Sequence, residues 1–436
     1  MDLLCNAYST ASDEEESANG NRRQPESELP RPKRVRMETF VHKPRTMSLY
    51  RHSPSPSLPP EAPLPGRYIS KRERAASTSG TTVHNPNSTS MPVPSPVEGT
   101  ISESDLPHNI LSKLRNQRKD SASLCQMPQG VSATLDGHSK PVNTIQWSKS
   151  HAHLLASAGI DCAVSIWNVW SRDQKRVRTL NFHNAAVKDV KWSEQGLFVL
   201  SCGYDCASRL IDVEQGRETQ VFQEDQVVGV VKFHPHNFNL FVSGGSKGLL
   251  KLWDIRMGKV VHEYRRSLGP ILDAEFSVDG KQLISSSDES RSNISENSIV
   301  VWDVFRQVPL SNQVYVEAFT CPCIRFHPLD PYFIAQSNGN YIAIFSSKSP
   351  FKLDKYKRYQ GHGVHGFPIK CNFSLDGNMV ASGSSDGFIY FYDSKSSQLI
   401  RKMKAHEQAS IDVAFHPIIP NVIATCSWDG QVLLFE

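Results

Sequence analysis

From residue 131 onward the chain consists of short runs in which apolar and polar residues alternate, separated by turn residues. The clearest copy is VSATLDGHSKPVNTIQWSKSHAHLLASAGIDCAVSIWNV, residues 131–169, where one apolar run ends at Trp147, a second is LLASA and a third closes at Trp167. Alternation with a period of two is typical of β-strands that bury one face. The copy therefore predicts three short strands of one sheet.

The same pattern recurs along the rest of the chain at a nearly constant spacing. The residues that close the first run lie 45, 41, 43, 50, 47 and 42 positions apart, and those that end the third run lie 44, 42, 49, 43, 47 and 43 apart. Such a period, close to the roughly 40 to 45 residues of a propeller blade, predicts an all-β fold with seven blades. The marks are Trp147, Trp192, Phe233, Phe276, Phe326, Phe373 and Phe415 for the first run, and Trp167, Ile211, Trp253, Trp302, Phe345, Tyr392 and Phe435 for the third.

These copies resemble the WD repeat, because a Gly-His pair, a turn aspartate and a closing tryptophan stand at its spacing. The resemblance implies that His138 bonds Asp161 across a turn, that Ser157 links the pair inward, and that the indole of Trp167 completes the network. Copies three to five keep only part of this set. In three further copies it implies the same roles for His183, Ser201 and Asp205, for His362, Ser382 and Asp386, and for His406, Thr425 and Asp429.

The ends of the repeat region predict how the ring closes. The sequence stops at Glu436, directly after the third strand of the seventh copy, while residues 131–135 precede the first Gly-His turn without a sheet of their own. An unpaired sheet edge is a liability that closed folds remove. We therefore expect residues 131–135 to form the outer strand of the seventh blade.

The region before the repeats has a different composition. Of the 27 prolines, 16 lie in the first 130 residues, and aromatic residues are few there. Such a segment buries too little surface to offset its chain entropy. We expect residues 1–125 to be largely disordered and residues 126–436 to form the seven-bladed WD β-propeller. The apolar spacing in residues 104–118 predicts a short amphipathic helix, which either docks on the propeller or a partner or stays frayed.

Charge is divided unevenly between these regions. Residues 1–125 hold 17 basic and 14 acidic side chains, which leaves 31 and 30 for the remainder, a net charge of only +1. The repeat region therefore gives no reason to expect binding of nucleic acid by bulk charge, and any RNA contact is expected to be indirect or through the basic N-terminal region. Residues 21–75 contain 13 basic and 5 acidic side chains. Their PRPKRVR cluster predicts a nuclear import signal, with a solvated charge run as the alternative; its basic residues are Arg31, Lys33, Arg34 and Arg36.

Signatures of catalysis and of cofactor binding are missing from the sequence. It contains no phosphate-binding loop, no HExxH or GxSxG motif, and no CxxC pair among its nine cysteines. Most histidines and aspartates recur at the repeat spacing, which marks them as turn residues. We expect a protein that is not an enzyme, without cofactor, metal or small-molecule substrate. No apolar run reaches the roughly 18 residues of a membrane span, so no membrane partner is expected either.

Partner binding is expected where the repeat leaves side chains free. The residue before the turn aspartate is Ile160, Tyr204 or Trp428 in three copies that are neighbours in a closed ring. Exposed tyrosine and tryptophan are frequent anchors of protein interfaces, which favours a partner site on this sector. The alternative is that these rings lie flat on their own turns.

Two functions agree with this sequence. The last two copies resemble those of splicing-factor members of the WD-repeat family, which implies a nuclear scaffold, a monomer within a larger complex, that binds spliceosomal proteins. The alternative is a substrate receptor of a cullin-RING ubiquitin ligase, because Trp253-Asp254-Ile255-Arg256 resembles the WDxR motif by which such receptors dock their adaptor. Only Arg256 adds information there, since the repeat already requires Trp253 and Asp254.

Overall fold

The computed structural model describes residues 94–117, 127–264, 269–288, 298–311 and 319–436. These residues belong to one compact unit, Asn87–Glu436. The expected disorder of residues 1–93 and the predicted import cluster lie outside the described residues, as does most of the polar insert of the fourth copy.

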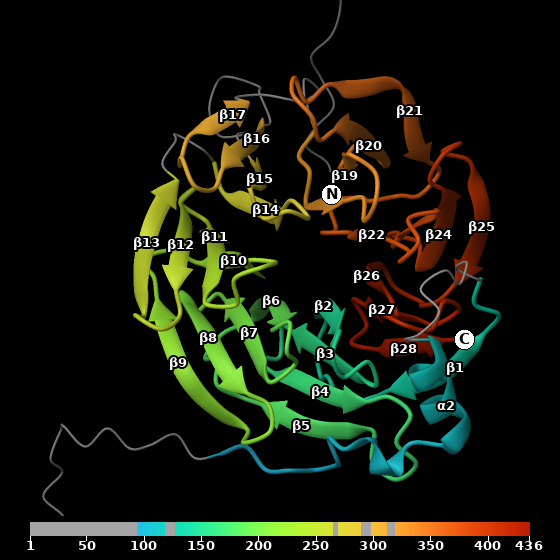
Figure 1. Ribbon diagram of the computed structural model, residues 1–436. Helices are drawn as coiled ribbons and strands as arrows, with labels where there is room; N and C mark the ends of the chain where they lie inside the picture. Colours follow the sequence, from blue (N-terminus) through green and yellow to red (C-terminus); the bar gives the residue numbers. More distant parts are fainter. Residues whose placement is uncertain (1–93, 118–126, 265–268, 289–297, 312–318) are drawn as a thin grey trace, which may run out of the picture. The chain divides into compact units, whose positions relative to one another are not determined.

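Seven four-stranded antiparallel sheets stand around a central axis (Figure 1), which confirms the predicted seven-bladed propeller. The innermost strands, one in each blade, carry the first-run aromatics. They are β2 (Val142–Trp147), β6 (Val187–Trp192), β10 (Val228–Phe233), β14 (Ile271–Phe276), β18 (Cys323–Phe326), β22 (Cys371–Phe373) and β26 (Ser410–Phe415). The second strands are β3 (Leu154–Gly159), β7 (Phe198–Gly203), β11 (Leu240–Gly245), β15 (Gln282–Ser287), β19 (Tyr332–Ser337), β23 (Met379–Ser382) and β27 (Ile423–Ser427).

The third and outer strands complete each blade. The third strands are β4 (Val164–Asn168), β8 (Ala207–Asp212), β12 (Leu250–Asp254), β16 (Ser298–Asp303), β20 (Tyr341–Ser346), β24 (Phe388–Asp393) and β28 (Val432–Phe435). The outer strands are β5 (Arg176–Leu180), β9 (Arg217–Gln223), β13 (Lys259–Tyr264), β17 (Pro309–Ser311), β21 (Leu353–Gln360), β25 (Leu399–Lys404) and β1 (Val131–Leu135).

Antiparallel strands give the ring two distinct faces. The turns between first and second strands, and between third and outer strands, lie on one face, here called the first-turn face. The turns between second and third strands lie on the opposite face together with the links between blades, and this is the second-turn face. In blade 1, residues 148–153 form a turn on the first-turn face, and residues 160–163 form the turn on the second-turn face.

The ring closes as predicted, by pairing between the two ends of the repeat region. Strand β1 pairs with β28 of blade 7, with Ala133 opposite Leu434 and Leu135 opposite Val432. The backbone N–H of Gln129 also donates to the carbonyl of Glu436 at 2.7 Å. The edge of β28 is therefore covered.

Residues 94–117 lie against the propeller, and docking there is one of the outcomes expected for the predicted amphipathic helix at residues 104–118. Their backbone follows the outer edge of blade 1, where the N–H of Glu98 donates to the carbonyl of Val177 at 2.9 Å. A short 3-10 helix, η1 (Glu103–Asp105), leads into helix α2 (His108–Gln117). Leu106, Ile110 and Leu114 are buried in one cluster with residues of blades 1 and 7. Proline-rich composition did not indicate the contacts of residues 95–99, because these come from the edge of blade 1 and from a turn of blade 2.

Candidate interaction surfaces

The turn network of blade 1 joins four side chains. His138 Nδ1 lies 2.9 Å from Asp161 Oδ2, and His138 Nε2 lies 2.7 Å from Ser157 Oγ. The indole N–H of Trp167 donates to the same Ser157 oxygen at 2.8 Å. Burial raises the pKa of Asp161, but the hydrogen bond and the charge of His138, together with the backbone N–H groups of Ser139 and Ala163, lower that pKa below its usual value. Both ring nitrogens of His138 are engaged, so the histidine has a structural task and no free nitrogen for acid–base chemistry.

Blade 2 repeats this arrangement without the indole. His183 Nδ1 lies 3.0 Å from Asp205 Oδ1, and His183 Nε2 lies 2.7 Å from Ser201 Oγ. Burial raises the pKa of Asp205, yet the hydrogen bonds of His183 and Arg209 bring it down to about 2. The buried Ile211 fills the place of the tryptophan.

Blade 3 builds an equivalent network from other residues. Ser243 Oγ donates to Glu224 Oε1 at 2.5 Å, and the indole of Trp253 donates to Ser243 Oγ at 2.9 Å. Lys247, which occupies the position of the turn aspartate, pairs with Asp225 at 3.1 Å. The sequence held a signal for this, since Glu224 precedes Ser243 by 19 residues, as His138 precedes Ser157.

In blade 6 the predicted network of His362, Ser382 and Asp386 does not form. The Gln336 amide of blade 5 donates to His362 Nε2 at 2.6 Å, and His362 Nδ1 lies 2.9 Å from the Tyr392 hydroxyl. His362 stands 11 residues before Phe373, whereas the equivalent spacing is 9 in blade 1, and the extra length carries the ring past its expected partners. Ser382 therefore donates to the carbonyl of Gly383 at 2.8 Å, and Asp386 accepts from the Tyr390 hydroxyl at 2.9 Å and from Lys402 at 3.1 Å.

Blade 7 keeps the first half of the network. His406 Nε2 lies 2.9 Å from Thr425 Oγ1, while the Asp429 carboxylate is 3.9 Å from His406 Nδ1. The buried Phe435 replaces the indole.

The three predicted anchors Ile160, Tyr204 and Trp428 occupy the same turn position on the second-turn face of blades 1, 2 and 7. Only Tyr204 is exposed, at 53%, with the Lys188 ammonium 5.8 Å from its ring centre. Ile160 and Trp428 are half-buried. The Trp428 indole packs edge-on against Phe367, with 5.4 Å between the ring centres, so the ring contacts the protein itself.

Arg256 is not brought together with these three residues. It lies in the turn after β12, on the first-turn face, and its guanidinium is 2.9 Å from the Asp254 carboxylate. The side chain is 68% exposed and can reach a partner.

A set of histidines on the first-turn face joins blades in pairs, and the sequence analysis missed it. Their signal was the recurring Phe-His-Pro at the end of three innermost strands. The backbone N–H groups of the following turn donate to Nδ1 of each histidine, so Nε2 carries the proton and donates to a carbonyl of the next blade. The donors and acceptors are His234 to Gly280 (3.1 Å), His327 to Gly377 (2.9 Å) and His416 to Ala152 (2.8 Å).

The two glycine acceptors suit this contact. Gly280 and Gly377 have positive φ values of 68° and 71°. A Cβ added at Gly280 would lie 2.7 Å from the ring of His234. Both the backbone conformation and the close approach of the ring therefore require glycine.

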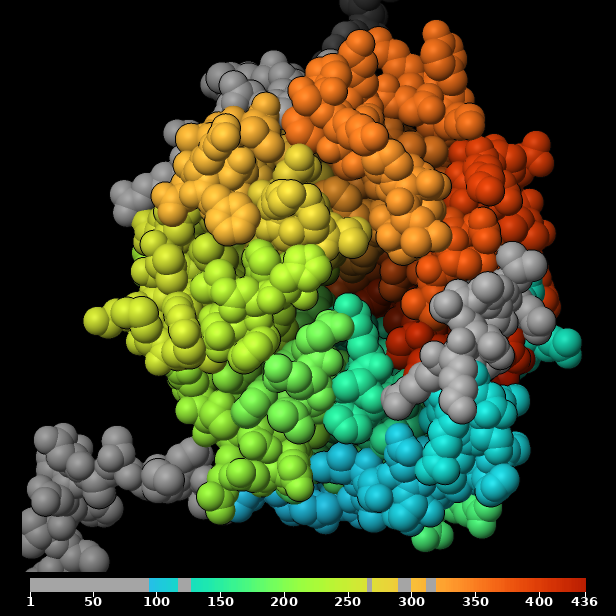
Figure 2. Space-filling view, viewed as in Figure 1, coloured from blue at the N-terminus to red at the C-terminus, as the bar shows by residue number. Residues whose placement is uncertain are grey.

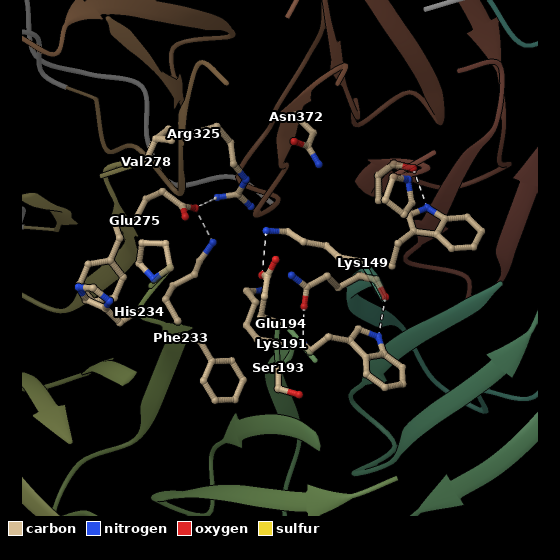
Figure 3. Close-up of a pocket in the computed structure, with 18 of the residues that line it drawn as sticks. Lys149, Lys191, Ser193, Glu194, Phe233, His234, Glu275, Val278, Arg325 and Asn372 are labelled. Atoms are coloured by element: carbon tan, nitrogen blue, oxygen red, sulfur yellow. Dashed lines mark hydrogen bonds and ion pairs between the residues drawn. The ribbon is translucent and has the colours of Figure 1, made fainter. Parts of the chain in front are cut away.

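A cavity of about 630 Å³ opens in the centre of the first-turn face (Figures 2 and 3). Its cations are already paired: Lys232 lies 2.5 Å from Glu275, and Arg325 lies 3.3 Å from Glu275. Lys191 pairs with Asp189. Burial raises the pKa of Asp189, but Lys191 and the neighbouring ammonium groups lower it to about 2. With Lys149 paired to Glu194, all four cations that line the cavity are thus engaged in ion pairs.

The mouth of this cavity has an apolar side and a charged side. Four consecutive blades, 3 to 6, place an exposed apolar side chain at the tip of the first turn, and three of the four line the cavity. These residues, here called the apolar rim, are Phe238 (53% exposed), Val278 (58%), Leu329 (75%) and Leu375 (53%). Blades 1 and 2 instead carry the exposed ion pair Lys149–Glu194 at 3.2 Å. Exposed apolar residues that gather around one opening mark an interaction surface better than scattered ones.

Within the part of the chain that the structure describes, no group of three or more histidine, cysteine, aspartate or glutamate residues could hold a metal ion. No helix among those residues is long and apolar enough to cross a membrane.

The repeat networks and the seven blades agree with the comparison with known families. The family model of the WD domain, G-beta repeat, matches residues 130–168, 174–212, 354–393 and 397–436. This chain contains WD repeats. The matched repeats build blades 1, 2, 6 and 7, whereas blades 3 to 5, with their substituted networks, fall between the matches.

Two kinds of relative align with about seven tenths of this chain. WD repeat-containing protein 25 of Mus musculus is 37% identical over 314 residues, which are 71% of this chain and 58% of the relative. Pre-mRNA-processing factor 17 of Mus musculus is 32% identical over 316 residues, or 72% of this chain and 53% of the relative. The factor of the same name from Saccharomyces cerevisiae is 28% identical over 297 residues, 67% of this chain and 64% of the relative. The chain thus spans little more than half the length of the two mouse relatives.

Proposed function

We propose that this WD-repeat protein is a non-catalytic nuclear scaffold that binds proteins of pre-mRNA splicing complexes, and that the apolar rim is its principal docking surface. The observation that carries the proposal is the rim itself, four exposed apolar side chains on consecutive blades, three of which line one opening. The similarity to pre-mRNA-processing factor 17 supports the splicing context.

The rim fits a protein segment with apolar side chains on one side and charged ones on the other. Blades 3 to 6 supply the apolar half of the mouth, and the Lys149–Glu194 pair supplies the charged half. A rigid ring presents this surface without rearrangement, which lowers the entropic cost of binding.

Affinity purification of the full chain from nuclear extract tests the proposal. Spliceosomal proteins and small nuclear RNAs are expected with the wild type and to be lost with Phe238→Ser/Leu375→Ser. The matched control is Val221→Ser/Val261→Ser, which removes exposed apolar residues from the outer strands of blades 2 and 3. Equal recovery by the rim variant would contradict the rim as docking surface.

The same purification separates the two candidate functions. Recovery of a cullin-RING ligase adaptor without splicing proteins, abolished by Arg256→Ala, would replace the splicing proposal with the receptor function. The exposure of Arg256 leaves it accessible to such an adaptor.

Nuclear import through the N-terminal cluster is a separate part of the proposal. Replacing Lys33, Arg34 and Arg36 by alanine is expected to shift a fluorescent fusion of the chain toward the cytoplasm. Unchanged nuclear signal would assign import to another segment or to a partner.

A further inference from the structure

The outer strand of blade 5 contains a bulge that projects a tyrosine into solvent. Leu353 pairs with Phe345 and Arg358 pairs with Ala343, so residues 354–357 stand outside the regular ladder. The Asp354 carboxylate accepts the backbone N–H groups of Tyr356 at 2.9 Å and of Lys357 at 3.1 Å, which closes the bulge. Tyr356 is 98% exposed as a result.

The bulge lies in a strongly basic stretch. Residues 348–358 hold five basic side chains and one acidic side chain, although residues 126–436 together carry an excess of only one. The acidic residue is Asp354, whose oxygen already accepts two backbone N–H groups. None of the ion pairs among the described residues involves Lys348, Lys352, Lys355 or Lys357. The near-neutral total therefore conceals a local excess of positive charge in residues 348–358.

A groove of about 500 Å³ adjoins the bulge, between blades 5 and 6. Three cations line it, Lys352 and Lys357 from the basic stretch of blade 5 and Lys395 from blade 6. The ammonium of Lys357 donates to the backbone carbonyl of Lys395 at 3.1 Å, which ties the bulge of blade 5 to the turn of blade 6. The groove also contains the carboxylates of Asp330 and Asp354, the latter engaged in the bulge.

We propose that this groove and Tyr356 bind single-stranded RNA, with the lysines on phosphates and the tyrosine ring stacked on a base. Cations flanking an exposed ring are the two elements of single-strand recognition, because every base offers a stacking face. An acidic peptide would need the cations but not the ring, and in a duplex the bases are already stacked. The inference goes beyond the scaffold function, since it places RNA contact on the propeller itself and does not depend on the identity of the complex.

Fluorescence anisotropy with the full chain and a labelled single strand of about 20 nucleotides tests the site. Lys355→Glu/Lys357→Glu is expected to weaken binding about tenfold or more and to lower the salt dependence of log K by about 1.4, two phosphates at about 0.7 each. The control Arg217→Glu/Lys259→Glu makes the same charge change on exposed outer-strand residues of blades 2 and 3. If the control weakens binding as much, bulk charge explains the binding and the proposal is wrong.

Substitutions of Tyr356 measure the contribution of ring stacking to RNA binding separately from that of the lysines. Tyr356→Ala is expected to weaken RNA binding about tenfold, whereas Tyr356→Phe, which keeps the ring, stays close to the wild type. Poly-glutamate is expected to compete poorly. An unchanged affinity of Tyr356→Ala together with efficient competition by poly-glutamate would identify the groove as a site for an acidic protein.

Cross-linking distinguishes the groove from the basic N-terminal region. Ultraviolet irradiation of the full chain with RNA containing 4-thiouridine is expected to cross-link the peptide that contains Tyr356. Cross-links confined to residues 21–75, or no binding at physiological salt, would overturn the proposal.

Discussion

Blades 1 and 2 and blades 3 to 5 have the same four-stranded architecture but use their residues differently. In blades 1 and 2 a histidine, a serine and an aspartate form the turn network, whereas in blade 3 Glu224 accepts from the serine. In blade 4 the serine is bonded to the indole, with Trp302 Nε1 donating to Ser285 Oγ at 2.9 Å. The comparison teaches that the buried serine and indole of a blade need hydrogen-bond partners, and that different residues can supply them.

The regular and irregular blades also differ in what their residues do, since the former hold turns and the latter carry most of the proposed binding surfaces. The family model matches blades 1, 2, 6 and 7, where recurring residues hold turns. The apolar rim spans blades 3 to 6, and the basic bulge belongs to blade 5. Residues that are bonded within a blade are not available to a partner, so the surfaces proposed for binding lie mainly where the repeat is least regular.

Loss of ring closure is expected to have the largest effect, because it should unfold the regular blades and the irregular blades alike. Removing residues 1–135 deletes β1 and exposes the edge of β28, so we expect no cooperative unfolding transition by circular dichroism. Removing residues 1–93 leaves β1 and helix α2 in place and should preserve the transition. Removing residues 1–126 is expected to give an intermediate melting temperature. A cooperative melt of the longest deletion at the wild-type temperature would contradict closure by β1.

Acidification is expected to weaken blades 6 and 7 first. Burial lowers the pKa of His362 and of His406 to about 4, and that of His416 to about 3. Because the unfolded chain binds these protons near pH 6.5 and the folded chain does not, stability is complete above about pH 6.5 and falls as the pH drops toward 4. At about pH 5, each of these histidines should lower the free energy of unfolding by about 2 kcal/mol relative to neutral pH.

Urea unfolding at neutral and at mildly acidic pH measures this dependence. His416→Gln, which keeps an amide donor toward the Ala152 carbonyl, is expected to reduce the pH dependence by about one third, since it removes one of three such groups. A pH dependence that His416→Gln leaves unchanged would show that this histidine is protonated in the folded state.

A matched pair of serine substitutions sharpens the comparison between intact and reduced networks. Ser157→Ala leaves the buried Nε2 of His138 and the indole N–H of Trp167 without their partner, whereas among the described residues Ser285→Ala removes the partner of Trp302 alone. We expect losses in unfolding free energy of about 2 to 4 kcal/mol and about 1 to 2 kcal/mol respectively. Equal losses would show that the histidine bond contributes no net stability in blade 1.

The smallest effects are expected on the second-turn face. Trp428→Ala removes a half-buried ring packed on Phe367 and should cost about 1 to 2 kcal/mol, while Tyr204→Ala should stay within about 0.5 kcal/mol. Thermal unfolding compares the two. A large loss for Tyr204→Ala would mean that its ring supports the turn instead of facing a partner.

Several features could be predicted from the sequence because they depend on local spacing. The number of blades followed from two marks at a shared period, and closure by residues 131–135 followed from an unpaired edge. The partners of His362 could not be predicted, since Gln336 reaches it from another blade and lies 26 residues away. For residues 94–117 the sequence indicated the helix but not its partners, because the contacts that hold this segment come from blades 1, 2 and 7.

The sequence by itself determined the period, the strand faces and the turn residues, since each of these is a property of neighbouring positions along one chain. The tertiary structure alone decided which side chains gather around the central cavity, that Arg256 and Tyr204 lie on opposite faces, and that the lysines of blades 5 and 6 line one groove. These features join residues from different blades, and their distances are fixed by the closing of the ring.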